Sequence, residues 1–160
     1  MSLSKELQIG KVGEHLVCAD LILQGYNAFL ADQGLPFDVL VEQEGNLKRI
    51  QVKTTTKLIN TKKEHDIYRF GLRRGRHLNR RIDIGNLDYV AFVALDIMKI
   101  AYIPISLLAT EGGKMKQCME FKSERKPYYK RQGNYRRQKA YFESYNQFGG
   151  DATGLRGDRV

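Results

Sequence analysis

The segment from Pro36 to Lys53 constrains the fold more than any other part of the sequence, because it carries the pattern of a β-hairpin. Residues 37–43 and 47–56 alternate apolar and polar side chains over much of their length, as strands with one buried face do. They flank Gly45-Asn46, and a glycine–asparagine pair is typical of a two-residue hairpin turn. The sequence therefore predicts two antiparallel strands joined in a definite register.

The register of this hairpin decides which side chains share a face. A turn at Gly45-Asn46 pairs Glu44 with Leu47 and places Asp38 opposite Lys53. Leu40 and Gln51 then face each other, and all four side chains of these two pairs point to one side, because strand side chains alternate. The other face receives Phe37, Val39, Val41, Ile50 and Val52, which are suited to a core. A slip of one residue would destroy this grouping.

Residues 4–24 repeat apolar side chains at helical spacing, with Ser4 as N-cap and Gly25 as C-cap. The expected apolar stripe consists of Ile9, Val12, Leu16, Ala19 and Leu23. Gly10 and Gly13 lower the helix propensity by about 1 kcal/mol each relative to alanine. A glycine pair in mid-helix permits close approach by another backbone, here either the sheet or a ligand.

The polar face of the hairpin has the chemistry of a metal site. Asp38 and Gln51 offer a carboxylate and an amide oxygen, hard ligands that suit Mg²⁺. A metal ion there can activate water and stabilise the charge that develops in phosphodiester cleavage. Lys53 can orient or deprotonate the attacking water, or neutralise the phosphate. Glu14 completes the acidic cluster if its helix packs beside the hairpin. Each of these four residues taken alone could be an ordinary surface residue, so the prediction of a metal site depends on their occurring together.

The net charge of +9 predicts attraction to nucleic acid, and the cations are concentrated in residues 62–81 and 121–140. The first segment follows the hairpin, so its arginines can contact phosphates or enter a groove. The second interleaves cations with tyrosines, which also suits base stacking. The residues expected to bind DNA are Arg69, Arg73, Arg74, Arg76, Arg80, Arg81, Lys130, Arg131, Tyr135, Arg136 and Arg137. A salt-bridged surface is the plainer alternative, but few acids lie near the second segment.

The remaining pattern predicts one α/β domain. Further strands are expected at 26–30, 66–72, 86–96 and 98–103, a short helix at 104–110 and a basic helix at 136–148. The nearly continuous apolar run 89–95 suits a strand buried on both faces, which implies helices covering a mixed sheet. The domain is expected to span residues 1–148, followed by a mobile Gly-rich tail at 149–160.

Other classes of protein are disfavoured. No apolar run is long enough for a membrane span and the start lacks a secretory signal, so we expect a cytoplasmic protein without a membrane partner. Cys18 and Cys118 have no paired spacing, which favours idle thiols in a reducing compartment. His15 and Cys18 have no second pair of ligands with which to form a zinc site.

The quoted residues resemble the PD-(D/E)XK nuclease superfamily. The likeness is carried by Gly13-Glu14 on the helix, Pro36-Phe37-Asp38 and Gln51-Val52-Lys53, and is clearest over residues 8–56. It is closest to the Gln-bearing variant represented by a homing endonuclease encoded in bacterial group I introns. The sequence motif differs from the family motif at Phe37, which separates the proline from the acid. It departs again at Gln51, which replaces the usual acid and removes one negative charge.

This resemblance implies a restriction-endonuclease-like core, a mixed β-sheet flanked by helices, and Mg²⁺-dependent cleavage of double-stranded DNA, with Mn²⁺ able to substitute. It implies Asp38 as the principal metal carboxylate and Gln51 as the second ligand, with the Val52 carbonyl beside it. Lys53 would be the catalytic lysine, and Glu14 matches the helix-borne acid of the family.

The resemblance also implies a homo-oligomer, a dimer or a tetramer, because small nucleases cut both strands by pairing copies. Two alternatives to a site-specific endonuclease remain open at this point. One is a structure-selective nuclease of the Holliday-junction resolvase type. The other is a nucleic-acid-binding protein that keeps the fold without cutting.

Overall fold

The fold is described from a computed structural model of the 160-residue chain. The structure describes residues 4–59, 67–74, 80–81, 84–109, 112, 114–123 and 140–150. Several residues expected to bind DNA lie outside these ranges, namely Arg76, Lys130, Arg131, Tyr135, Arg136 and Arg137. The same holds for residues 151–160 of the expected tail.

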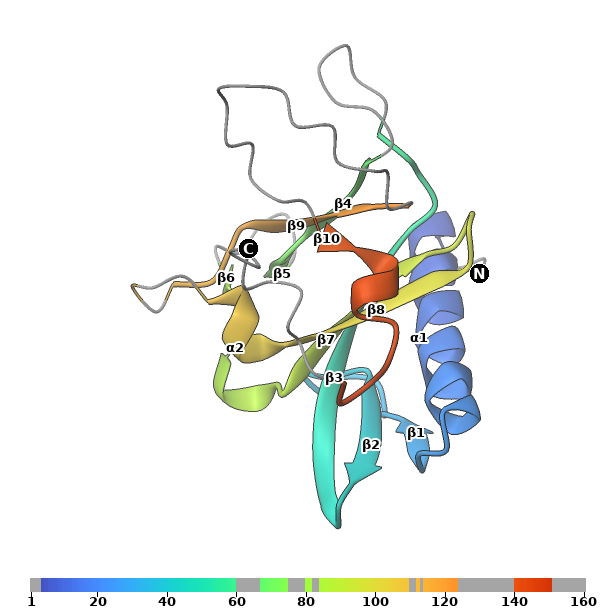
Figure 1. Cartoon of the computed structure of the whole chain (residues 1–160), viewed down its shortest axis with the longest axis vertical. Coiled ribbons are helices and arrows are strands. Elements are labelled where there is room, and N and C mark those ends of the chain that lie inside the picture. The colour runs from blue at the N-terminus through green and yellow to red at the C-terminus, as the bar shows by residue number, and fades with distance from the viewer. Residues whose placement is uncertain are drawn as a thin grey trace, which may run out of the picture.

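A five-stranded mixed sheet forms the centre of the molecule, in the order β1-β2-β3-β7-β8 (Figure 1). Its strands are β1 (Ala28–Leu30), β2 (Val39–Gln43), β3 (Asn46–Thr55), β7 (Tyr89–Ala94) and β8 (Lys99–Pro104). Only β3 and β7 pair in parallel, and the other neighbours are antiparallel. Strand β3, which carries Gln51 and Lys53, is the central strand and lies between β2 and β7.

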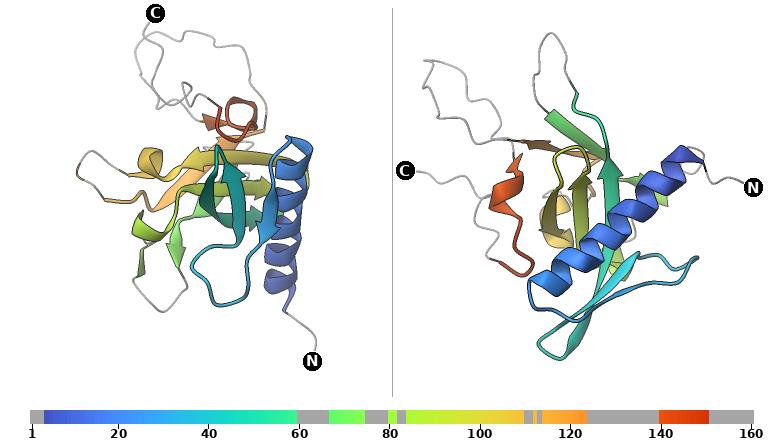
Figure 2. Two further views of the ribbon diagram at one scale, coloured as in Figure 1. Left: turned by 90° about the horizontal axis from the view of Figure 1, so that it is seen from below. Right: turned by 90° about the vertical axis from the view of Figure 1, so that its right-hand side faces the viewer.

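The long helix α1 (Lys5–Leu23) lies across one face of this sheet (Figure 2). It begins as predicted, with the Ser4 side chain accepting a hydrogen bond from the Leu7 N–H at 3.4 Å. It ends at Leu23 with Gln24 as its C-cap, one residue before the predicted Gly25, which has φ +92°. Among the described residues, no helix combines the length and the apolar character that crossing a membrane requires.

The predicted apolar stripe of α1 is wrong. The residues of the helix that are buried are Gly13, Val17 and Leu21, whereas Val12 is 49% and Leu23 is 87% exposed. The cause lies at Gly13, which packs so closely on Thr54 of β3 that an added Cβ would overlap the Thr54 hydroxyl. This close approach confirms the expectation for Gly13, and it turns a different face of the helix toward the sheet.

A second, three-stranded sheet in the order β10-β9-β4 covers the opposite face (Figure 1). Its strands are β4 (Ile67–Gly71), β9 (Cys118–Lys122) and β10 (Ala140–Tyr141). The short α2 (Ile105–Leu108) follows β8 near the expected place. A separate two-stranded ribbon pairs β5 (Arg73–Arg74) with β6 (Arg80–Arg81).

Two apolar cores result, one on each face of the central sheet. The helix-side core includes Val17, Leu21, Val39, Val41, Ile50, Ala91 and Val93. The sheet-side core includes Phe70, Val90, Phe92, Ile103, Phe121 and Phe142. Strand β7 contributes alternate residues to both, so the prediction that it is buried on both faces is confirmed. The expected helices over the sheet are α1 on one face and the short α2 on the other, where Leu108 enters the sheet-side core next to the strands of the second sheet.

The helix predicted at 136–148 is not formed over its described part. Residues 140–148 instead make β10 and a 3₁₀ turn at Phe142–Ser144. The segment then returns to the end of α1, where the Gln24 amide donates to the Asn146 carbonyl at 3.0 Å and accepts from the Phe148 N–H at 2.8 Å. Phe142 and Phe148 enter different cores, and a single helix would not reach both.

Candidate functional site

The hairpin turn lies one residue earlier than predicted. Glu44 and Gly45 occupy the turn, with φ values of 51° and 77°, and Gln43 pairs with Asn46. A two-residue turn of this kind needs positive φ at both central positions, and Gly45 adopts it without steric cost. The Asn46 amide donates to the Glu44 carbonyl at 3.3 Å. The predicted turn at Gly45-Asn46 is therefore wrong.

This correction leaves the faces of β2 and β3 unchanged, because it moves the pairing by two residues. Asp38, predicted opposite Lys53, instead forms hydrogen bonds with the backbone of Ile50 and Val52. Leu40 lies opposite Arg49 instead of Gln51, and Val39 lies opposite Ile50. A shift by an even number keeps each strand's side chains on their predicted sides. Val39 and Ile50 are fully buried on the helix side, so Gln51 and Lys53 share the opposite face of β3.

Asp38 lies immediately before β2 and continues its pairing with β3 through its side chain. Its N–H donates to the Ile50 carbonyl at 2.9 Å, and its carboxylate accepts the Val52 N–H at 2.7 Å. The strand alternation breaks at this point, since Phe37 packs on the sheet-side core although Val39 enters the helix-side core. The prediction that Phe37 shares the side of Val39 is thus wrong, and the break leaves the Asp38 carboxylate beside the backbone at Val52.

The carbonyl of Val52 points to the same side as its N–H. In a strand, both backbone groups of one residue are directed at the same neighbouring strand. Because the Val52 N–H meets Asp38, its carbonyl is also directed to the side of β3 on which Asp38 lies. The structure therefore brings together two of the three predicted metal ligands, the Asp38 carboxylate and the Val52 backbone.

Gln51 supplies the observation that tests whether a cation fits here. The residue is 8% exposed, and its buried Oε1 has no hydrogen-bond partner among the residues that the structure describes. Leaving such an oxygen unpaired costs about 1–3 kcal/mol, and the described residues contain two further oxygens of this kind, the hydroxyls of Thr54 and Tyr145. A hard amide oxygen of this kind is a suitable ligand for Mg²⁺, and the site residues fit a divalent cation.

Charged groups from two elements act on Asp38. Burial raises the pKa of Asp38, the Val52 N–H lowers it, Glu14 raises it, and Lys53 and Lys11 lower it. The charges of Glu14 and Lys53 thus both act on the Asp38 carboxyl. Lys11 was missed, although its place one turn before Glu14 on the helix was a usable signal.

Lys11 makes a direct contact with the helix-borne acid. Its Nζ lies 2.6 Å from Glu14 Oε2, with the two side chains 41% and 17% exposed. The pKa of Lys11 is raised, first by this hydrogen bond, with the charges of Glu14 and Asp38 adding to it against the effect of desolvation. A second cation therefore belongs to the site.

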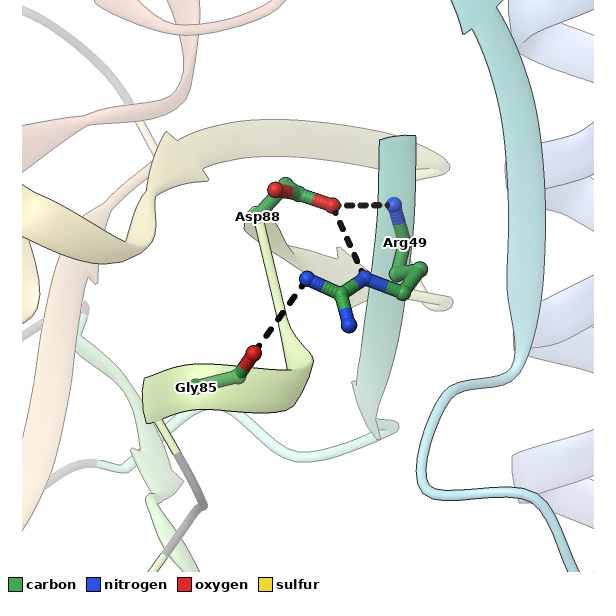
Figure 3. Close-up of polar contacts among 3 residues, drawn as sticks. All are labelled: Arg49, Gly85 and Asp88. Carbon is green, nitrogen blue, oxygen red and sulfur yellow. Dashed lines mark hydrogen bonds and ion pairs between the residues drawn. The ribbon is translucent and has the colours of Figure 1, made fainter. Parts of the chain in front are cut away.

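Arg49, on the same face of β3 as Gln51, is held by a separate ion pair (Figure 3). The Asp88 carboxylate accepts from the Arg49 N–H at 2.8 Å and from Nε at 3.2 Å, and Arg49 also donates to the Gly85 carbonyl at 3.3 Å. These bonds join β3 to the residues that precede β7. They fix the position of the strand that carries the candidate ligands.

Within the described part of the chain, no three His, Cys, Asp or Glu side chains converge on a metal position. Gln51 contributes an amide where an acid would count toward such a group, and Cys18 and Cys118 are free thiols. Two surface hollows of about 250 and 270 Å³ lie around residues 142–150 and β8, away from Asp38.

The basic residues fall into three groups. Arg69 on β4 is 44% exposed, and its Nε lies 2.7 Å from Glu120 Oε1. Arg73, Arg74, Arg80 and Arg81 form the ribbon, whose backbone pairs Arg73 with Arg81 and Arg74 with Arg80. The others lie outside the described residues. The first segment thus concentrates arginine on one small element.

Comparison with known proteins identifies the group to which the chain is similar. A family model described as PD-(D/E)XK endonuclease matches residues 4–142. The solved structure of a bacterial homing endonuclease, I-Ssp6803I, matches with a TM-score of 0.59 and 16% identity, over 82% of this chain and 84% of that chain. Hjc, a Holliday junction resolvase from Archaeoglobus fulgidus, matches with a TM-score of 0.43 and 14% identity, over 71% and 83%. No curated protein matches the chain significantly. The homing endonuclease shares the fold.

Proposed function

The chain belongs to the PD-(D/E)XK endonuclease family, as its motifs indicated, and we propose that it hydrolyses phosphodiester bonds in double-stranded DNA with the help of Mg²⁺. The observation that supports this most directly is the unpaired, buried Oε1 of Gln51 on the face that also carries Lys53. The Asp38 carboxylate, held by the Val52 N–H, lies against the same stretch of strand. We propose that the cut is site-specific, as in a homing endonuclease.

In this proposal the chain's own groups divide the work. Asp38, Gln51 and the Val52 carbonyl hold the cation, and Glu14 adds a second carboxylate from α1. When bound, Mg²⁺ lowers the pKa of a water molecule and stabilises the charge on the phosphate, and Mn²⁺ supplies the same chemistry. Lys53 orients the attacking water or neutralises the phosphate in the transition state.

The proposed substrate follows from the charge of the protein. A net charge of +9 favours a polyanion, and the arginine pairs of β5 and β6 form a two-stranded ribbon, an element narrow enough for the major groove of DNA. Cutting both strands requires two active sites, so we propose that the protein acts as a homo-oligomer, a dimer or a tetramer.

Cleavage of plasmid DNA in Mg²⁺ or Mn²⁺, against EDTA, tests the proposed activity. We expect Asp38→Ala and Lys53→Ala to lower the rate by at least about 100-fold, because each removes a group that acts on the reacting phosphate or water. Asp32→Ala and Lys57→Ala are the matched controls, since both remove the same charges from exposed positions.

Three outcomes separate the candidates. Full activity of Asp38→Ala would refute the site. Cutting of a four-way junction but not of linear duplex would favour structure-selective cleavage over a site-specific endonuclease. Binding without cutting in either metal would make the protein a non-catalytic member of the family.

A further inference from the structure

Lys11 has a charge environment that an ordinary surface lysine lacks. It contacts Glu14 at 2.6 Å on the same helix and also lies within electrostatic reach of Asp38. Its side chain is 41% exposed, whereas that of Glu14 is 17% exposed. Lys11 is therefore the more exposed partner of the pair and is open to a competing anion from solvent.

The charges of the site cancel before any metal binds. Glu14 and Asp38 contribute two negative charges, Lys11 and Lys53 contribute two positive ones, and Gln51 contributes none. With an acid at position 51 the same set would carry a net negative charge and attract a divalent cation strongly. In this chain Glu14 is the second carboxylate available to a cation, and it is already engaged with Lys11.

We propose that Lys11 is a positioning residue that holds Glu14 in the DNA-free protein and releases it when a DNA phosphate takes over the lysine. Glu14 is then free to turn toward the cation, so that metal and DNA bind cooperatively. This inference rests on the proposed function. In this chain, DNA binding would make the Glu14 carboxylate available to the cation and so replace the negative charge that an acid at position 51 would supply.

The geometry suits a lysine that changes partner. A single contact between a half-exposed lysine and a carboxylate is a weak interaction, and a phosphate can compete with it. Lysine presents a point charge on a flexible stem, so it can move without breaking a bidentate arrangement. Arg49 is different, because three hydrogen bonds tie it to Asp88 and Gly85.

The competing explanation is a helix-stabilising pair, since residues three apart on a helix often form one. Such a pair would affect the stability of α1 and would leave metal affinity unchanged. The two explanations therefore differ in metal binding measured without catalysis.

The test is Mn²⁺ binding to the full chain, counted as free Mn²⁺ by electron paramagnetic resonance, with and without a phosphorothioate duplex that resists cleavage. Without DNA, we expect Lys11→Met to bind Mn²⁺ about three- to tenfold more tightly than the unmodified protein. Lys5→Met, which removes the same charge from an exposed position of the same helix, should change affinity less than twofold. Lys11→Arg should keep the weak affinity.

The duplex supplies the second readout. It should tighten Mn²⁺ binding by a larger factor in the unmodified protein than in Lys11→Met, because Glu14 is already free in the variant. Equal Mn²⁺ affinities for Lys11→Met and Lys5→Met would overturn the inference about Lys11. The proposed function would survive that result if Asp38→Ala still abolished binding, whereas undetectable Mn²⁺ binding by every variant would overturn both.

Discussion

Strand β3 has two faces that differ in the side chains they carry. Toward α1, Ile50 is fully buried in the helix-side core, and Thr54 packs against Gly13 with a buried hydroxyl that has no hydrogen-bond partner among the described residues. On the opposite face, Gln51 keeps a buried oxygen without a partner, and Lys53 lies within reach of the Asp38 charge. The α1 face therefore consists mainly of apolar packing with one tight contact at Gly13, while the opposite face carries the amide and the lysine of the candidate site. Substitutions on the two faces should therefore have opposite consequences.

The largest expected change in stability comes from a substitution on the face of β3 that packs against α1. Gly13→Ala should destabilise the protein by about 1–3 kcal/mol, because its Cβ would overlap the Thr54 hydroxyl. Gly10→Ala is the matched control and should stabilise by up to about 1 kcal/mol, since beyond the helix's own backbone no described residue comes within 4 Å of the added carbon. Urea unfolding measures both. Equal responses would show that α1 does not approach β3 at Gly13.

The second effect sharpens the contrast on the polar face. Gln51→Leu should stabilise the protein by about 1 kcal/mol, since it removes an unpaired buried oxygen, and should abolish metal-dependent cleavage. Gln51→Glu should bind Mn²⁺ more tightly and be less stable in EDTA, because it buries a charge. Unfolding in EDTA and Mn²⁺ titration test the pair. Loss of stability in Gln51→Leu would show that the amide supports the fold.

The smallest expected effect concerns pH. Burial raises the pKa of Asp38 above the ordinary 3.8, so the folded protein binds more protons than the unfolded chain in the range between the two values. Stability from this group is therefore highest below the ordinary pKa and declines as pH rises through the folded pKa. Asp38→Asn removes the titration and keeps an acceptor for the Val52 N–H.

The Asn variant should accordingly gain stability relative to the unmodified protein as pH rises from 3 to 7 without metal. Thermal unfolding across that range measures the difference. A difference that does not change with pH would show that Asp38 is not responsible.

Several features of the site could be predicted because they depend on neighbours in the sequence. Alternation along β3 placed Gln51 and Lys53 on one face, and this survived a turn that was assigned one residue too late. The turn position was predicted wrongly, because Glu44 and Gly45, instead of Gly45 and Asn46, adopt the positive φ values of the turn. The face on which a strand side chain lies changes only if the pairing shifts by an odd number of residues. The pairing of β2 with β3 shifted by two, so Gln51 and Lys53 kept their predicted face.

Other features could not be predicted because they depend on contacts between distant segments. The buried face of α1 was assigned from apolar side chains, but Gly13 determines it by having none. The turn of residues 140–148 into a strand follows from Phe142 and Phe148 entering different cores. Lys11 joined the site only when α1 was placed beside Asp38.

The sequence by itself determined the chemistry of this protein: an acid, an amide and a lysine at hairpin spacing, in a chain of strong positive charge. This spacing lies within one short segment, so the alternation of side chains along a strand is enough to determine which of them share a face. The tertiary structure decided that Gln51 is buried without a partner and that Lys11 is paired with Glu14 beside Asp38. Burial and electrostatic reach are properties of packed elements, which no single segment contains.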